Sequence, residues 1–187
     1  MRILHYLAWF SFVGVFLFDV WQYIDIHVLQ HIHADLFGLS LASREKGLAL
    51  LDDWSRVTTR TGASVLDAAR LNTRWDYLFI FGYVCVLVIL SYSRMQREPR
   101  PWLNTLLRLN FLLAFLAGLL DAIENAILLT DMAPCNIGNT FFPSRPFSLA
   151  KFILGAWAVL VLLFSVTTSR LATGAPISPP EDLSARD

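Results

Sequence analysis

The sequence of 187 residues has few charged side chains and only two cysteines. Lysine, arginine, aspartate and glutamate make up 16% of the residues, against about 25% in an average soluble domain. Fifteen basic and fifteen acidic residues give a formal net charge of zero. The sequence has no stripe of basic residues of the kind that binds nucleic acid. Cys85 and Cys135 should lie at different depths, which argues against a disulfide. The composition therefore disfavours both a nucleic-acid-binding protein and a disulfide framework.

The sequence also lacks the motifs of common soluble enzymes. It contains no G-x-S-x-G, no P-loop, no dinucleotide-binding glycine pattern and no C-x-x-C. These absences argue against widespread kinds of soluble catalysis. They leave lipid chemistry open, because that chemistry can run on Asp, Glu and His side chains scattered along a chain.

Apolar residues, in contrast, make up 56% of the sequence and gather in four long runs. A helix that crosses a bilayer needs ~20 mostly apolar residues, with a range of ~17 to 25. We place transmembrane helices at about residues 3–24, 75–94, 103–129 and 148–168. The predicted fold is all-α, an integral membrane four-helix bundle formed by one domain, residues 1–171. Residues 172–187 are rich in Pro, Ser and charge, which predicts a disordered tail.

The first apolar run is compatible with a signal peptide or with an uncleaved helix. Bulky and polar residues, "DVWQY", follow it where an A-x-A-like cleavage site would need small ones, which favours the uncleaved helix. Four antiparallel helices put both termini on one side, together with the arginine-rich connection "RMQREPRP". By the positive-inside rule we expect the termini in the cytoplasm.

The long connection between the first two membrane helices, residues 36–72, is predicted to be helical and to lie outside the membrane. In "SREKGLALLDDWS", Ser43 can cap an amphipathic helix that lies on the membrane surface or folds back over the bundle. The residues that share one face of this helix are Leu48, Leu51 and Trp54. A second helical stretch from Ser64 should run into the next membrane helix, with Asn72 or Thr73 as a break and cap.

Charged residues interrupt the apolar runs at positions that converge on one half of the membrane. The segment "LLDAIENAILL" carries Asp121, Glu124 and Asn125 near the end of the third helix. Lys151 lies near the start of the fourth helix, so antiparallel packing brings it to a similar depth. Asp76 begins the second helix on the same side. We therefore predict a salt bridge from Lys151 to Glu124 or to Asp121.

The energetics favour such a pair. Lys151 lies in the first turn of its helix if Ser148 is the cap, and a cation there costs roughly 0.3 to 1 kcal/mol against the helix dipole. An unpaired charge at the bilayer centre costs roughly 2.5 to 3.5 kcal/mol, and pairing offsets both penalties. One lysine does not neutralise two acids. Either a second cation joins, from Arg74, Arg145 or His27, or one acid keeps a proton.

Small and polar residues recur at helical spacing on the third and fourth helices. The two stripes are Asn110, Ala114, Ala117, Gly118, Asp121 and Asn125 on the third helix, and Lys151, Gly155 and Ala158 on the fourth. Small residues let membrane helices approach closely. We expect the stripes to pack together, leaving Leu and Phe for lipid.

The stretch "DIHVLQHIHAD" contains three histidines between two aspartates, which are side chains that can bind a metal ion. His27 and His31 are four residues apart, so on a helix they share a face and could bind one metal ion. Further ligands would be acids such as Asp76 or Glu124. The alternative is a pair of interfacial histidines at a helix end. No His follows residue 33, which excludes an axial haem pair from two helices, and no cofactor is indicated.

Three stretches resemble a diffuse group of small four-helix membrane proteins, mostly bacterial and without an established activity. They are "WDYLFIFGY" (75–83), "LLDAIEN" (119–125) and "LAKF" (149–152). The group has D-x-L-F-I opening the second helix, D-x-x-E-N in the third and K-F or K-W opening the fourth. The resemblance covers roughly residues 75–155 and implies the four-helix topology. It also implies a joint role for Asp76, Asp121, Glu124, Asn125 and Lys151, and it names no substrate.

Three functions fit these patterns. The first is an accessory or interaction protein of a bacterial inner membrane whose Asp/Glu/Lys cluster holds the bundle or receives a lipid-like ligand, with Asp76, Asn125 and Lys151 as binding residues. The second is a membrane-embedded enzyme acting on lipid headgroups or quinone-like substrates, with Glu124 or Asp121 as catalytic acid or base. The third is a proton-coupled carrier that works as an oligomer. Expected partners are membrane lipid and a membrane protein or a second copy of the chain.

Overall fold

The computed structural model describes residues 2–23, 36–59 and 62–173, and the regular structure in these ranges is helical apart from one bridge between Thr58 and Ser64. The helices are α1 (Arg2–Tyr23), α2 (Leu36–Ser40), α3 (Arg44–Arg56), α4 (Val65–Met95), α5 (Pro101–Asp131) and α6 (Arg145–Thr173). The predicted all-α class is confirmed. His27, His31 and most of the predicted tail lie outside the described residues.

Three of these helices are long and apolar enough to cross a membrane. They are α4, α5 and the part Arg145–Thr168 of α6, whereas α1 contains a shorter apolar stretch, Trp9–Phe18. Length and composition of the three helices indicate a membrane protein.

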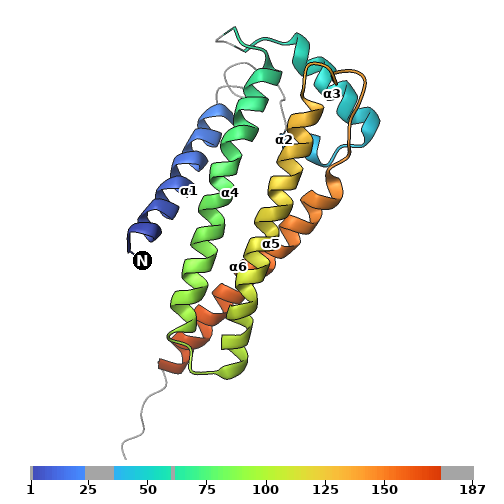
Figure 1. Ribbon diagram of the computed structural model, residues 1–187. Coiled ribbons are helices and arrows are strands. Elements are labelled where there is room, and N and C mark those ends of the chain that lie inside the picture. Colours follow the sequence, from blue (N-terminus) through green and yellow to red (C-terminus); the bar gives the residue numbers. More distant parts are fainter. Residues whose placement is uncertain (1, 24–35, 60–61, 174–187) are drawn as a thin grey trace, which may run out of the picture.

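The long helices lie side by side, with α5 between α4 and α6 and with α1 packed along α4 (Figure 1). Contacts between α4 and α6 are sparse compared with those each makes to α5. The beginning of α1 and the end of α6 point toward one end of the bundle, and α2 and α3 lie at the other (Figure 1). The helices thus form a group in which α5 is central and α1 is peripheral.

Helix α4 is continuous, and the predicted break at Asn72 or Thr73 is wrong. The helix begins at the residue after Ser64, whose Oγ accepts a hydrogen bond from the Asp67 backbone N–H at 3.0 Å. Thr73 is buried, and its hydroxyl donates to the Ala69 carbonyl at 2.9 Å. Because this bond satisfies the hydroxyl within the helix, the threonine does not interrupt it.

Helix α6 begins at Arg145, one turn earlier than expected, so Ser148 is not its cap. Ser144 and Ser148 are both buried, and their hydroxyls donate to the Ser40 carbonyl at 3.2 and 3.3 Å. These bonds fasten the end of α2 to the start of α6. Lys151 consequently lies in the second turn of α6, further from the positive end of the helix dipole than predicted.

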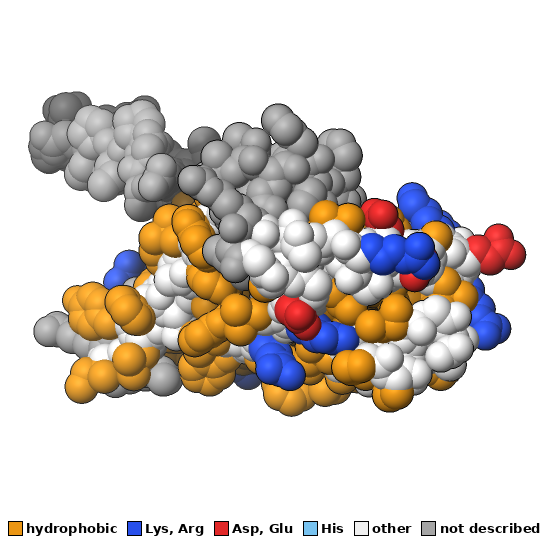
Figure 2. All heavy atoms as spheres, turned by 90° about the horizontal axis from the view of Figure 1, so that it is seen from above, with side chains coloured by type: hydrophobic (Ala, Val, Ile, Leu, Met, Phe, Trp, Pro, Cys, Tyr) orange, Lys and Arg blue, Asp and Glu red, His pale blue; other side chains and the backbone are white. Residues whose placement is uncertain are grey.

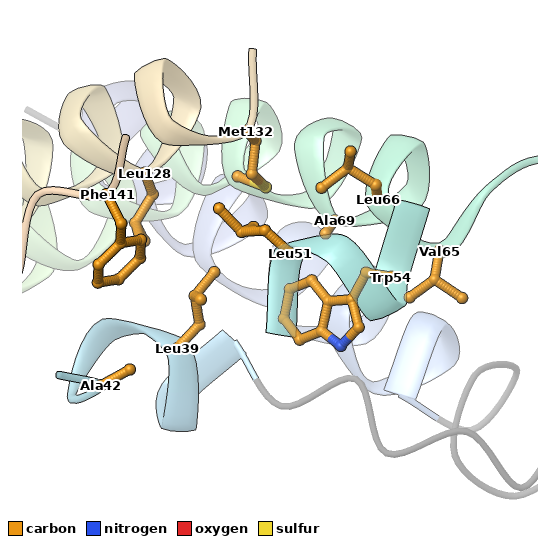
Figure 3. Close-up of a cluster of buried hydrophobic side chains, with 10 residues drawn as sticks. All are labelled: Leu39, Ala42, Leu51, Trp54, Val65, Leu66, Ala69, Leu128, Met132 and Phe141. Carbon is orange, nitrogen blue, oxygen red and sulfur yellow. The ribbon is translucent and has the colours of Figure 1, made fainter. Parts of the chain in front are cut away.

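Helix α3 folds back over the start of α4 and the end of α5. Trp54 and Leu51 are buried, and Leu48 is partly buried. Figure 3 shows their neighbours from the other elements, Leu39, Ala42, Val65, Leu66, Ala69, Leu128, Met132 and Phe141. The amphipathic face predicted for this helix therefore forms an apolar core at one end of the bundle. Ser43 occupies the N-cap position without a side-chain cap hydrogen bond.

Large apolar side chains cover the outer faces of the long helices. Phe115 of α5 is 62% exposed and Ile153 of α6 is 68% exposed. In the view along the bundle from the α3 end, Lys, Arg, Asp and Glu side chains gather on the side of α3, whereas the side of α1 is mainly apolar (Figure 2). An exposed surface of this extent suits contact with lipid.

The short turn between α4 and α5 holds a buried carboxylate, Glu98. Its Oε1 accepts a hydrogen bond from Arg100 Nε at 2.6 Å, and Arg94 Nη2 lies 3.6 Å from its Oε2. The two arginines also reach α6, where Arg94 Nη2 donates to the Ser165 carbonyl and Arg100 Nη2 to Thr168 Oγ1, both at 2.8 Å. This end of α6 is thereby fastened to the turn.

The middle of the bundle is held by the small and polar stripe of α5. Asn110 is buried, and its Nδ2 donates to Ser91 Oγ of α4 at 3.0 Å and to the Ala158 carbonyl of α6 at 2.9 Å. At Gly118 an added Cβ would meet Val84 Cγ2 at 2.6 Å. The predicted packing of the two stripes is confirmed at Ala158 and Lys151, whereas Gly118 approaches α4 instead of α6. The expectation for Gly155 is wrong, because nothing lies within 4 Å of a Cβ built there.

Replacing Gly118 by alanine tests the close approach of α4 and α5. The added methyl group overlaps Val84, so we expect the free energy of unfolding to fall by about 1–3 kcal/mol. Gly155→Ala is the matched control, because open space there leaves only the helix-propensity gain of about 0.5–1 kcal/mol. Thermal unfolding of the purified variants in mild detergent measures both. Equal stability of the two variants would contradict the packing described.

The Glu98 network predicts a pH dependence. The hydrogen bond from Arg100 lowers the pKa of the Glu98 carboxyl below its usual range. A lowered folded-state pKa stabilises the protein above the unfolded pKa of about 4.3, and this stabilisation is lost as the pH falls through the folded pKa. The melting-temperature difference between wild type and Glu98→Gln should therefore be largest near neutral pH and shrink in acid. A difference independent of pH would contradict an ionised Glu98.

Candidate functional site

Five polar residues predicted from the sequence lie together where α4, α5 and α6 meet. They are Asp76 of α4, Asp121, Glu124 and Asn125 of α5, and Lys151 of α6, called the polar cluster below. The three α5 residues are spaced so that they share one face of the helix. That face is turned inward, since Asp121 is 7%, Glu124 2% and Asn125 4% exposed.

Lys151 pairs with both acids of α5. Its Nζ donates a hydrogen bond to Asp121 Oδ1 and lies 2.8 Å from Glu124 Oε2. The predicted salt bridge to one acid or the other is thus confirmed, with both acids taking part. Buried charges of this kind need partners, because the low-dielectric surroundings do not solvate them.

Two further hydrogen bonds connect the polar cluster to α4. Asn125 Nδ2 donates to Asp76 Oδ2 at 2.7 Å, and the Tyr83 hydroxyl donates to Asp121 Oδ2 at 3.1 Å. Tyr83 was missed at the sequence level. The signal for it was its spacing, because it follows Asp76 by seven residues, or about two helical turns, and shares its face.

The polar cluster holds three carboxylates and one ammonium group. Arg74 and Arg145, considered above as second cations, are exposed, and in the part of the chain that the structure describes neither pairs with the cluster. His27 lies outside that part. Lys151 is the one cation that contacts the cluster within the described residues. The cluster therefore has an excess of acids.

Two cavities adjoin the polar cluster. A cavity of about 150 Å³ lies under α2 and is lined by Leu36, Phe37, Ser40, Asn72, Thr73, Asp76, Glu124, Asn125, Leu128, Lys151 and Phe152. A larger cavity of about 390 Å³ is lined by Asp76, Phe79, Tyr83, Ala117, Asp121, Lys151, Phe152, Gly155 and Ala156. The larger one is bounded by α4, α5 and α6, where α4 and α6 make few contacts.

Phe152 borders both cavities together with Asp76 and Lys151. Its ring packs on Phe37 of α2, with the ring centroids 5.6 Å apart, and the Lys151 Nζ lies 5.2 Å from its centroid. A cation at this distance from an aromatic ring is attracted to it. These contacts bring α2, the start of α6 and the ion pair together at the border of the two cavities.

Metal binding finds no support in the described residues, where no group of three or more His, Cys, Asp or Glu side chains is arranged to hold an ion. His27 and His31, the predicted metal ligands, lie outside the described residues. Asp76 and Glu124 are accounted for by the polar cluster. The histidine hypothesis stays a prediction.

Comparison with protein-family models, with curated proteins and with solved structures finds no match to the chain. The resemblance to small four-helix membrane proteins therefore stays a prediction from short motifs. Functional inference depends on the geometry of the polar cluster and its two cavities.

Replacing Lys151 by methionine tests the ion pair. The substitution keeps an unbranched side chain, one atom shorter, and leaves Asp121 and Glu124 buried without a cation, so we expect a loss of about 3–5 kcal/mol in the free energy of unfolding. Arg145→Met, at an exposed site on the same helix, should change it by less than about 0.5 kcal/mol. Denaturant unfolding in detergent compares the two. A Lys151→Met variant as stable as the control would refute the described pairing.

Proposed function

We propose that the chain is an integral membrane protein of four membrane-crossing helices that binds a lipid-like ligand at the polar cluster. Three helices have the length and composition for crossing. α1, with 22 residues, would be roughly 33 Å long at 1.5 Å per residue, and its exposed apolar side chains support a fourth crossing. We place the protein in a bacterial inner membrane with cytoplasmic termini. Arg94 and Arg100, at the α4–α5 turn, contact the last turns of α6 and support this orientation.

The observation that carries the ligand site is the larger cavity beside the ion pair. Side chains do not close over the polar cluster, and a partly open cavity of about 390 Å³ adjoins Asp76, Asp121 and Lys151. Ligand pockets in proteins measure roughly 300 to 1,000 Å³, so this one suits part of a lipid-sized molecule.

An accessory role is compatible with this site. The ion pair holds α5 to α6 while Asp76 and the cavity face a ligand, so the same residues support the bundle and the binding. The exposed apolar surface of α1 leaves room for a membrane-protein partner or a second copy of the chain.

A catalytic role is the second candidate, and one observation favours it. Glu124 is buried and lines the smaller cavity. A carboxylate at the wall of a cavity can exchange a proton with a bound molecule. Glu124, with Asp121 and Lys151 beside it, would then act as acid or base on a lipid headgroup or a quinone-like substrate. If the wild type turns over such a substrate and a folded Glu124→Gln variant does not, the catalytic role is supported.

Native mass spectrometry of the protein, extracted gently with its own lipids, tests the ligand site. We expect a stoichiometric small amphiphile on the wild type and its loss from Glu124→Gln, because the amide removes the charge from the cluster. Asp53→Asn is the matched control, because it makes the same chemical change on the exposed face of α3, and it should keep the ligand.

Two results would oppose this proposal. A wild type without a small ligand but with a stoichiometric protein partner would favour an accessory role in which the cluster only holds the helices. An amphiphile retained at full occupancy by Glu124→Gln would place the ligand elsewhere. Melting temperatures of both variants, measured in parallel, show whether Glu124→Gln is folded.

A further inference from the structure

The charges of the polar cluster are unbalanced. Lys151 lies against Asp121 and Glu124, whereas Asp76 receives a hydrogen bond only from the neutral Asn125 amide and forms no ion pair within the described ranges. Three carboxylates with one ammonium group attract a cation and repel an anion. The imbalance matters most at membrane depth, where an uncompensated charge costs several kcal/mol.

The polar groups at the smaller cavity are mainly acceptors. Asn72 Oδ1 is buried without a hydrogen bond, and Asn72 lines this cavity together with Asp76 and Glu124. A buried acceptor of this kind calls for a donor. A primary ammonium group offers three N–H donors and a positive charge, whereas a phosphate or carboxylate group would add further acceptors.

The larger cavity combines aromatic and small apolar walls. Phe79, Tyr83 and Phe152 line it next to the carboxylates of Asp76 and Asp121. Aromatic faces attract cations, including alkylated ammonium groups. The remaining lining residues, Ala117, Gly155 and Ala156, offer little more than apolar surface. A molecule with a cationic head and an alkyl chain matches both kinds of wall.

Building on the proposed function and depending on it, we propose that the ligand is an alkylammonium compound. Its ammonium group lies beside Asp76, where it supplies the missing positive charge and N–H donors. Its chain occupies the larger cavity between α4 and α6. The same chemistry is found in the amine headgroup of a membrane lipid and in a free amphiphilic amine.

Binding of three probes with the same chain to the full-length protein tests the charge of the ligand. We use decylammonium, decyl sulfate and decanol below their micelle concentrations, with protein in an uncharged detergent, and follow calorimetric titration and melting temperature. Decylammonium should bind saturably and raise the melting temperature of the wild type, and the other two probes should not.

Variants locate the site. Asp76→Asn keeps the shape of the side chain and the contact with Asn125 but removes the charge, so we expect decylammonium to bind about tenfold more weakly. Asp53→Asn, which changes an exposed carboxylate of α3 in the same way, should bind like the wild type. Unchanged binding to a folded Asp76→Asn variant would overturn the assignment of the ammonium group to this residue.

Nanodiscs distinguish the two sources of the ligand. Decylammonium binding in phosphatidylglycerol discs that disappears when phosphatidylethanolamine is added identifies a lipid amine headgroup as the occupant. Binding that is the same in both kinds of disc identifies a free amine. Either result supports an ammonium site.

Failure of this inference and failure of the ligand site give different results. If decyl sulfate or decanol binds as well as decylammonium, and Glu124→Gln abolishes the binding, the ligand site stands and the ammonium inference is overturned. If decylammonium does not bind to the wild type, the ammonium inference is overturned as well. The ligand site fails when, in addition, native mass spectrometry finds no amphiphile that depends on Glu124.

Discussion

The ammonium group of Lys151 contacts two carboxylates of the neighbouring helix, and the positions of α5 and α6 depend on this contact. Asp121 and Glu124 are buried among apolar helices, where an acid without a partner is costly. Lys151 compensates them from α6. Asn125, one residue beyond Glu124, binds Asp76 of α4 and so brings the third helix to the same point. Lys151 and Asn125 therefore join three helices at one level of the bundle. Asp76 lies there at the edge of both cavities.

Three polar connections follow one another along the bundle. The polar cluster lies at the α2 end, Asn110 joins α4, α5 and α6 in the middle, and Glu98 with its two arginines fastens α6 to the α4–α5 turn at the other end. Hydrophobic association contributes little between helices in lipid, so polar contacts and close packing of small residues take its place. The close approach at Gly118 joins α4 to α5, and the space around Gly155 leaves a cavity between α4 and α6.

Much of the polar cluster could be predicted from the sequence. Few charges occur in the apolar runs, and antiparallel neighbours place the end of one helix beside the start of the next, which brings Lys151 to Glu124. The buried stripe of α5 followed from its helical period. The amphipathic face of α3 could also be predicted from the sequence. Its position over the bundle depends on apolar neighbours from α2, α4, α5 and the loop after α5.

Other features were not accessible from local patterns. Thr73 suggested a helix break because its hydroxyl can compete for backbone groups, yet in α4 that hydroxyl bonds within the helix. α6 begins before Pro146, a residue that fits a first helical turn because its missing N–H would be unpaired there anyway. The burial of Glu98 was not predicted, because its arginines meet partners in α6 that lie about 70 residues further along the chain. The cavities arise from how side chains fill space, which no sequence period encodes.

Cryo-electron microscopy of the protein in lipid nanodiscs, at a resolution that shows side chains, is the most direct test of the ligand site. We expect Lys151 between Asp121 and Glu124, and elongated density in the cavity bounded by α4, α5 and α6 that ends beside Asp76. Side chains that fill this cavity, with α4 and α6 in contact and the ion pair intact, would contradict a ligand site and leave the polar cluster a purely structural connection.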